Sequence, residues 1–214
     1  MKTVAITLAL ILAALGMGCQ TAPERSRNLA DPSISGKTLA QQVCSNCHGL
    51  DGNSVNPNFP KLAQQQKDYF IDEMKEFKSH DRYDPAGYEY MWGLSRSLSD
   101  KQVDELASYF TGQTNIPDKS TDSKREAEGK LIFNQGVPDK NIPPCMVCHG
   151  AEAAGLGAFP RLAGQHADYI MKQLLVFQRT DERAQGAVMK NIAHELTPDN
   201  IRNVAAYLST MSTK

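Results

Sequence analysis

The residues with the clearest chemical potential are two copies of the pattern Cys-x-x-Cys-His. The members of this pattern are Cys44, Cys47 and His48 in the first copy, and Cys145, Cys148 and His149 in the second. Two thiols about one helical turn apart can form thioether bonds to the two vinyl groups of one haem. The next side chain can then bind the iron through the imidazole Nε2. Two such copies predict two covalently bound haem c groups.

Three other uses of paired cysteines fit this pattern less well. Two Cys-x-x-Cys pairs that share a structural zinc are typically separated by about 15–20 residues, whereas 97 residues lie between these pairs. Thiol redox chemistry of the thioredoxin type needs a βαβ setting, which the sequence does not indicate. A disulfide within either pair would constrain the chain little and would leave the histidines unexplained.

Both patterns belong to a duplication that covers most of the chain. The segment Phe59-Pro60-Lys61-Leu62-Ala63 returns 100 residues later as Phe159-Pro160-Arg161-Leu162-Ala163. A chain of 214 residues suits two domains of about 100 residues each. The predicted segments are a signal peptide (1–18), a flexible tether (19–34), a first domain (35–114), a linker (115–123) and a second domain (124–214).

The repeated domains are predicted to be all-α, two tandem helical domains joined by a short linker. Apolar residues recur with helical spacing near the end of each half, and no segment shows sustained strand alternation. Ser99 with Gln102 has the spacing of a capping box, and Thr197-Pro198 places a cap before an N1 proline. The predicted buried stripes are Val103, Leu106, Ala107 and Phe110 in the first half, and Ile201, Val204, Ala205 and Leu208 in the second.

The sixth ligand of each iron determines whether a haem carries electrons or activates small molecules. Met91 and Met189 occupy matching places in the repeat, 43 and 40 residues after His48 and His149. A thioether sulfur is soft and neutral, so it favours ferrous iron and raises the reduction potential. We therefore expect both methionines to be axial ligands, carried by irregular segments that precede the closing helices.

The other methionines and histidines of the two predicted domains lack partners in the repeat. The methionines are therefore predicted to fill core space, which is the usual role of this residue. The histidines are expected either at the surface or in satisfied positions. These residues are Met74, Met146, Met171 and Met211, with His80, His166 and His194.

The N-terminus resembles an export signal. Lys2 precedes an apolar run from Val4 to Leu15 that is too short to span a bilayer comfortably but suits a secretory signal. Cys19 closes this region and resembles the lipidated cysteine of a bacterial lipoprotein, and Gln20 after it resembles an outer-membrane sorting signal. The alternative is ordinary cleavage near Ala22, which would discard Cys19. The predicted location is the periplasm, with a lipid anchor in the outer membrane or as a soluble protein.

These motifs together resemble the cytochrome c4 family, dihaem proteins made of two class I cytochrome c domains in tandem. The second half matches best, with Phe159-Pro160-Arg161-Leu162-Ala163-Gly164-Gln165, and the first half departs by having Gln64 in place of that glycine. The resemblance implies His48/Met91 and His149/Met189 axial pairs. It further implies that the carbonyls of Pro60 and Pro160 accept a hydrogen bond from each proximal imidazole.

The resemblance implies a carrier of single electrons whose haems approach each other across the domain interface. Expected partners are membrane respiratory complexes such as a terminal oxidase, or an upstream dehydrogenase.

A formal net charge of −1 argues against broad nucleic-acid binding. The alternative is a dihaem enzyme, peroxidase-like or thiosulfate-oxidising, with one open or differently ligated iron. Arg82 and Arg183 either pair with haem propionates or are solvated.

Overall fold

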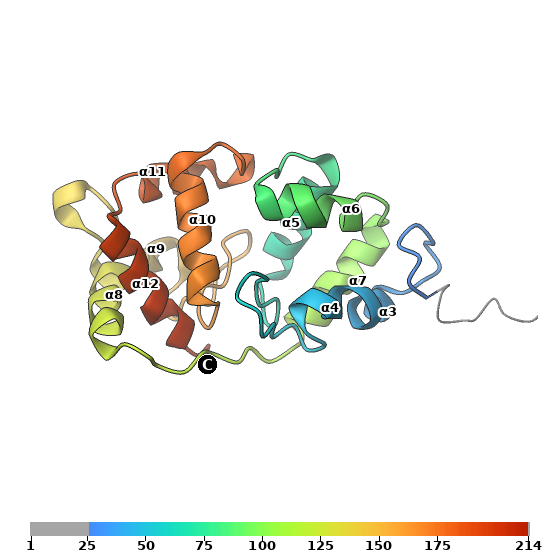
Figure 1. Cartoon of the computed structure of the whole chain (residues 1–214), viewed down its shortest axis with the longest axis horizontal. Helices are drawn as coiled ribbons and strands as arrows, with labels where there is room; N and C mark the ends of the chain where they lie inside the picture. Colours follow the sequence, from blue (N-terminus) through green and yellow to red (C-terminus); the bar gives the residue numbers. More distant parts are fainter. Residues whose placement is uncertain (1–25, 214) are drawn as a thin grey trace, which may run out of the picture.

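Each half of the chain folds into a small helical domain, and the two domains lie side by side along the long axis of the molecule (Figure 1). The structure is a computed structural model that describes residues 26–213. The predicted signal peptide and Cys19 lie outside these residues. No β-strand occurs within residues 26–213, only three isolated bridges. The predicted all-α class is therefore confirmed.

The first domain contains five α-helices and two π-helical turns, and the second contains five α-helices and two 3-10 turns. In the first domain these are α3 (Gly36–Leu39), η1 (Ala40–Cys44), α4 (Ser45–His48), α5 (Lys67–Ser79), η2 (Gly87–Met91), α6 (Trp92–Ser95) and α7 (Asp100–Thr111). In the second they are α8 (Ser123–Gln135), η3 (Pro138–Lys140), α9 (Met146–His149), α10 (Ala167–Arg179), η4 (Ala184–Gly186), α11 (Ala187–Ala193) and α12 (Pro198–Thr210).

The closing helices α7 and α12 supply the centre of each core. All eight residues of the two predicted stripes are buried, because apolar side chains at helical spacing share one face of the helix. Both helices begin with a capping box, in which the side chains of Ser99 and Thr197 accept from the backbone N–H of Gln102 and Asn200. Met74 is buried in the first core, and Met146, Met171 and Met211 pack against the second. The predicted packing role of these four methionines is confirmed.

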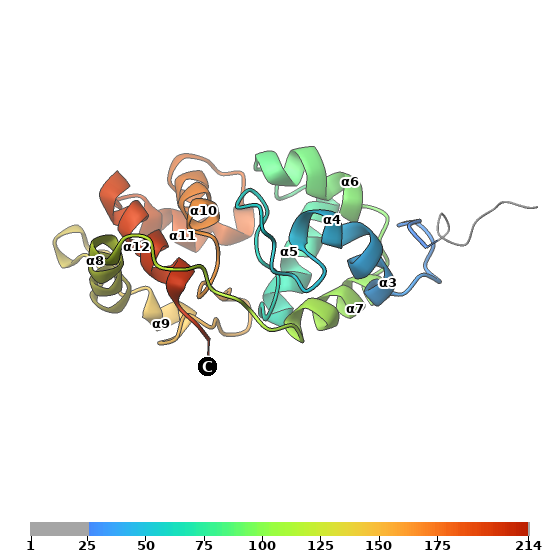
Figure 2. The same ribbon diagram turned by 60° about the horizontal axis from the view of Figure 1, so that its bottom comes forward.

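The connection between the domains is extended and is held against both of them. Figure 2 shows it passing from α7 to α8 near the C-terminal end of α12. The Ile116 N–H donates to Asn53 of the first domain at 2.8 Å, and the Asp118 N–H donates to the Ser209 carbonyl of the second at 2.9 Å. The linker therefore has a defined path. Within residues 26–213 no helix combines the length and apolar character needed to cross a membrane.

The segments that carry the predicted methionine ligands are helical, which corrects the expectation that they are irregular. Met91 ends the π-helical turn η2, and Met189 lies in α11. Neither helical turn contains a proline, and α11 begins with Ala187, a strong helix former. The periodicity was obscured because these turns are short and contain few buried residues.

Candidate functional site

The two Cys-x-x-Cys-His patterns form matching short helices. Cys44 ends η1 and Cys47 follows in α4, while Cys145 caps α9 and Cys148 lies within it. All four cysteines are free thiols. Each helix ends at a glycine with φ near +80°, and at Gly49 a side-chain Cβ would approach the Asn53 carbonyl oxygen to 2.9 Å. The glycine therefore lets the chain leave the cysteine pair in a tight turn.

The histidine of each pattern is buried and oriented by a backbone carbonyl. His48 Nδ1 lies 2.9 Å from the Pro60 oxygen, and His149 Nδ1 lies 3.0 Å from the Pro160 oxygen. A carbonyl oxygen only accepts, so the proton resides on Nδ1 and the Nε2 lone pair is left available to a metal. These are the two contacts that the family resemblance implies.

The protonation of these groups suits a haem site. Burial lowers the pKa of both histidines, and the proline carbonyls offset this only in part. Both imidazoles are therefore neutral near pH 7, as iron ligation requires. Burial also raises the pKa of the Cys44 and Cys145 thiols to about 11. Redox-active cysteines have a lowered pKa, so these two thiols lack the property that dithiol chemistry needs.

An aromatic ring lies against each histidine in the same geometry. The rings of His48 and Phe59 are edge to face at 6.2 Å, and His149 and Phe159 repeat this arrangement at 6.2 Å. Tyr90, next to Met91, extends the first contact by packing edge-on against Phe59 at 6.2 Å. Free thiols on one turn, a neutral Nε2 donor and apolar walls in both domains fit a covalently attached haem.

The structure places the two methionines in different surroundings. Met91 packs against the core of the first domain, to which Cys44 and Leu62 also contribute. Met189 is half-buried on α11, which packs against α10. Their assignment as axial ligands stays a prediction.

The loops that follow the two histidines meet at the domain interface and exchange hydrogen bonds reciprocally. The side-chain oxygen of Gln165 accepts from the Lys61 N–H at 2.8 Å, and that of Gln65 accepts from the Arg161 N–H at 2.6 Å. The amide groups return the contact by donating to the Lys61 and Arg161 carbonyls at 3.0 and 3.2 Å. Equivalent residues of the two domains therefore make equivalent contacts with each other, as in a two-fold symmetric interface.

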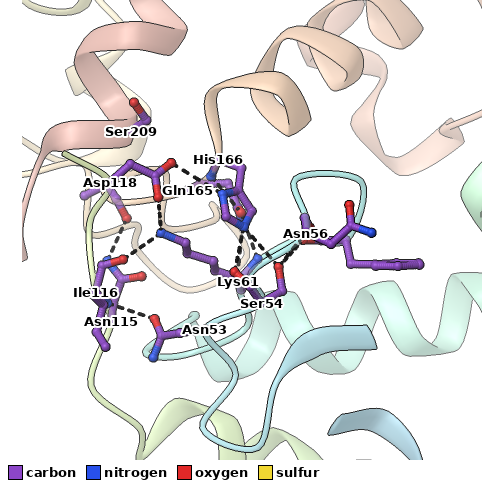
Figure 3. A network of polar contacts seen from close by, with 12 residues as sticks. Asn53, Ser54, Asn56, Lys61, Asn115, Ile116, Asp118, Gln165, His166 and Ser209 are labelled. Atoms are coloured by element: carbon purple, nitrogen blue, oxygen red, sulfur yellow. Dashed lines mark hydrogen bonds and ion pairs between the residues drawn. The ribbon is translucent and has the colours of Figure 1, made fainter. Parts of the chain in front are cut away.

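A second reciprocal pair lies one residue further along each loop. The Gln66 amide donates to the Ala154 carbonyl at 2.8 Å, and His166 Nε2 lies 2.9 Å from the Ser54 carbonyl (Figure 3). His166 is buried, and its Nδ1 lies 3.4 Å from the carboxylate of Asp118 in the linker. The expectation that His166 is satisfied is therefore confirmed.

Arg82 and Arg183 are buried in a charged cluster between α5 and α10. Both guanidinium groups form ion pairs with Glu73, and Arg82 also pairs with Asp84 at 2.9 Å. The arginine charges lower the pKa of Glu73 and Asp84 against the opposing effect of burial. The alternative in which these arginines are solvated is wrong, because each is at most 8% exposed.

His80 and His194 occupy opposite situations. His194 is a surface residue with 72% of its side chain exposed, as expected. His80 stacks between Tyr88 at 5.5 Å and Trp92 at 4.9 Å, and its buried Nε2 has no hydrogen-bond partner. His80 is therefore neither a surface nor a satisfied histidine, which corrects the prediction.

The interface residues Gln65, Gln165, Lys61 and Arg161 were not singled out as functional by sequence reasoning. The available signal was the repeated Phe-Pro-Lys/Arg-Leu-Ala segment, whose offset of 100 extends to the two glutamines. That signal indicated the duplication and the roles of the prolines but not an interface, because nothing in a linear repeat shows that its copies contact each other.

Comparison with known proteins places both domains in one family. The cytochrome c family model matches residues 33–113 and again residues 126–212. Cytochrome c-552 of Acidithiobacillus ferridurans is 41% identical over 171 residues, which cover 78% of this chain and 73% of the relative. Cytochrome c4 of Thiocapsa roseopersicina is 35% identical over 189 residues, 86% of this chain and 94% of the relative.

The fold also matches solved structures. The structure of Acidithiobacillus ferrooxidans cytochrome c4 superimposes with a TM-score of 0.73 at 41% identity, covering 78% of this chain and 98% of that one. A more distant relative is named as a thiosulfate dehydrogenase electron acceptor from Stutzerimonas stutzeri. It is 31% identical over 185 residues, 84% of this chain and 83% of the relative.

Proposed function

From the membership of this chain in the cytochrome c family, as a dihaem protein of the cytochrome c4 type with two covalently bound haem c groups, we infer its function. We propose that it shuttles single electrons between respiratory redox partners, and that neither iron has an open coordination position. The observation that carries this proposal is the pair of equivalent histidines, each buried, neutral and held by a proline carbonyl. Such equivalence favours two sites of the same kind over one electron-transfer and one catalytic site.

Each residue of the site has a defined role in this proposal. Cys44, Cys47, Cys145 and Cys148 hold the haems, and His48 and His149 bind iron through Nε2. Met91 and Met189 supply the second axial ligand. When bound, haem would supply a ferric/ferrous couple, and His48, Met91, His149 and Met189 would hold the irons in both oxidation states. The buried histidines would shield the irons from water, which stabilises the ferrous form.

The interface supports transfer between the two sites. Lys61 and Arg161 directly follow the prolines that orient the two histidines, and their backbones are joined through Gln165 and Gln65. The proximal loops are thereby fixed relative to each other. We therefore expect that an electron that enters through one domain can leave through the other.

The partners proposed are membrane respiratory complexes such as a terminal oxidase, or an upstream dehydrogenase. The similarity to a protein named as a thiosulfate dehydrogenase electron acceptor supports a dehydrogenase as donor. Export to the periplasm and anchoring through Cys19 complete the proposal, since c-type haem is attached outside the bacterial cytoplasm. The docking contacts are expected to be small and transient, as in other redox encounters.

The first test is an absorption spectrum of the oxidised protein with haem quantified per chain. Two haems with a full-strength methionine–ferric charge-transfer band would support two closed sites. Two haems with half of that band or none would contradict the proposal and favour a dihaem enzyme with an open or differently ligated iron. Carbon monoxide binding to the reduced protein provides an independent check, because closed sites should not react.

A further inference from the structure

His80 is held in an aromatic stack under two unfavourable local conditions. Its ring lies between those of Tyr88 at 5.5 Å and Trp92 at 4.9 Å, with interplanar angles of 18° and 25°. The backbone is left-handed, with φ +69°, which is uncommon for a residue other than glycine. The buried Nε2 has no hydrogen-bond partner among the described residues. A strained backbone and an unpaired buried nitrogen persist where the surroundings fix them, and they often mark a functional constraint.

The stack connects α5 to the segment that carries Met91. His80 caps the C-terminus of α5, whereas Tyr88 lies in η2 and Trp92 begins α6. These two rings come from positions three residues before Met91 and one residue after it. The His80 ring therefore holds the chain on both sides of the methionine. Arg96 lies over the Trp92 ring at 5.1 Å and extends the stack.

The methionine segment has a second attachment, to the loop that holds the proximal histidine. Met91 packs against the buried core of the first domain. Its neighbour Tyr90 packs edge-on against Phe59, the ring that lies beside His48. The segment is therefore joined to this loop through Phe59 and to α5 through His80. A ligand that is already held in place loses little further freedom when it binds, which strengthens its binding.

The second domain has no aromatic ring at any of the three stacking positions. The residues there are Thr180, Gly186 and Lys190. Thr180 caps α10 as His80 caps α5, but its hydroxyl group donates back to its own helix, to the Val176 carbonyl at 2.9 Å. No stack of this kind therefore holds the segment of Met189. The same predicted ligand is thus supported differently in the two domains.

We propose that His80 is a positioning residue that holds Met91 in place as an iron ligand, and that the haem of the first domain therefore keeps its sixth ligand more firmly than the haem of the second. This inference rests on the proposed function, in which Met91 and Met189 are the axial ligands. His80 acts through the rings that flank the methionine, so its role requires an aromatic ring and not the imidazole nitrogens. Breaking the stack should let an external ligand displace Met91 more easily.

The test is displacement of the methionine ligands by imidazole in the oxidised holoprotein, followed by loss of the methionine–ferric charge-transfer band. In a Met189→Ala background the remaining band belongs to the first domain, and the imidazole concentration that removes half of it is called the half-point. His80→Asn removes the ring but keeps a residue that tolerates the left-handed conformation. It should lower this half-point by about tenfold, the size expected when stacking on two ring faces is lost.

The matched control is the same His80→Asn change in a Met91→Ala background, where the remaining band belongs to the second domain and should keep its half-point. His80→Phe is the rescue variant, because it returns a ring to the stack without an imidazole nitrogen. In the Met189→Ala background it should bring the half-point to within about twofold of its original value. Trp92→Leu should reproduce the loss, and its combination with His80→Asn should lose little more than either change alone, because both break one stack.

An unchanged half-point in His80→Asn, while Met91→Ala still loses half of the band, would overturn the role of His80 and leave the proposed function intact. A lower melting temperature without a change in the half-point would have the same meaning, because the ring would then only stabilise the fold. If Met91→Ala keeps the full band, the axial assignment and the role of His80 both fail. If His80→Asn does not fold, the two methionine variants decide. The first domain should have the higher half-point, and equal half-points would contradict the proposal.

Discussion

The two domains share their haem-holding backbone and differ in the charges and rings placed around it. In both, a proline carbonyl orients the histidine and a phenylalanine lies edge-on against it. Glu73 of the first domain corresponds to Gln173 of the second, so both carboxylates of the buried interface cluster come from the first domain. The duplicated backbone therefore preserves the haem-binding geometry in both domains, whereas the side chains that differ around it distinguish the two sites.

A second difference lies next to the predicted methionine ligands. In the first domain Arg96 lies 5.1 Å over Trp92, which stacks on His80. At the place of Trp92 the second domain has Lys190, which pairs with Asp181. The segment of Met91 is therefore held by aromatic stacking and that of Met189 by an exposed ion pair, which contributes little in solvent.

The largest expected effect comes from removing each methionine in turn. Met91→Ala and Met189→Ala should each keep two covalent haems, lose half of the methionine–ferric charge-transfer band and lower one potential, because the thioether ligand favours ferrous iron. Each reduced variant should bind one carbon monoxide. Titration of both variants would show which domain holds the higher potential. Wild-type spectra in both variants would refute the axial assignment.

Replacing Glu73 with glutamine, the residue at the equivalent position of the second domain, should cause the largest loss of stability. Glu73→Gln reproduces the residue of the second domain and leaves two buried arginines with Asp84 alone. Removing one partner of a buried ion pair costs about 3–5 kcal/mol, so we expect a loss of about 3 kcal/mol in the free energy of unfolding near pH 7. Denaturant titration measures this loss, with Glu128→Gln as a control that removes the same charge from an exposed position.

The pH dependence of that variant follows from the direction of the pKa shifts. The arginines lower the pKa of Glu73 and Asp84 in the folded state. Their stabilising effect is therefore complete above the ordinary carboxyl pKa of about 4 and is lost as pH falls through the lower folded values. The wild type and Glu73→Gln should differ most near neutral pH and converge in acid. An equal difference at all pH values would exclude the ion pairs as its cause.

The turn after each proximal loop offers a smaller contrast. Gly164 has φ +67°, and a Cβ there would lie 2.1 Å from the Asn115 side-chain nitrogen. Gln64 adopts the same left-handed conformation with φ +57°, and its side-chain oxygen accepts from Asn115 and Thr213. We expect Gly164→Ala to lower stability by about 2 kcal/mol. Gln64→Gly should change it by less than about 1 kcal/mol, because relief of strain offsets the lost hydrogen bonds.

Small and nearly equal effects should come from the helix caps, where the domains are most alike. Ser99→Ala and Thr197→Ala each remove a side chain that accepts from the third helical N–H. Each should lower the free energy of unfolding by about 1 kcal/mol. Thermal unfolding of both variants should show similar losses, and a loss several-fold larger in one domain would indicate that the two domains do not unfold as one unit.

The features that follow local rules were predictable from the sequence. The stripes of α7 and α12, their capping boxes and the Cys-x-x-Cys-His turns depend on spacing within about a dozen residues. The helical turns at Met91 and Met189 were missed, because short exposed turns show little apolar periodicity. The burial of Arg82, Arg183 and Arg161 was not predictable, because it depends on the face that each domain presents to the other.

The reciprocal contacts through Gln65 and Gln165 have a consequence for how strongly the domains must bind each other. The linker makes their association intramolecular, with an effective concentration in the millimolar range for a short connection. An interface of a few side-chain bonds and balanced charges can then stay closed, although it would dissociate between separate chains at ordinary protein concentrations. After cleavage between Lys119 and Ser120, the association of the two domains would depend on protein concentration, and the domains would separate on dilution.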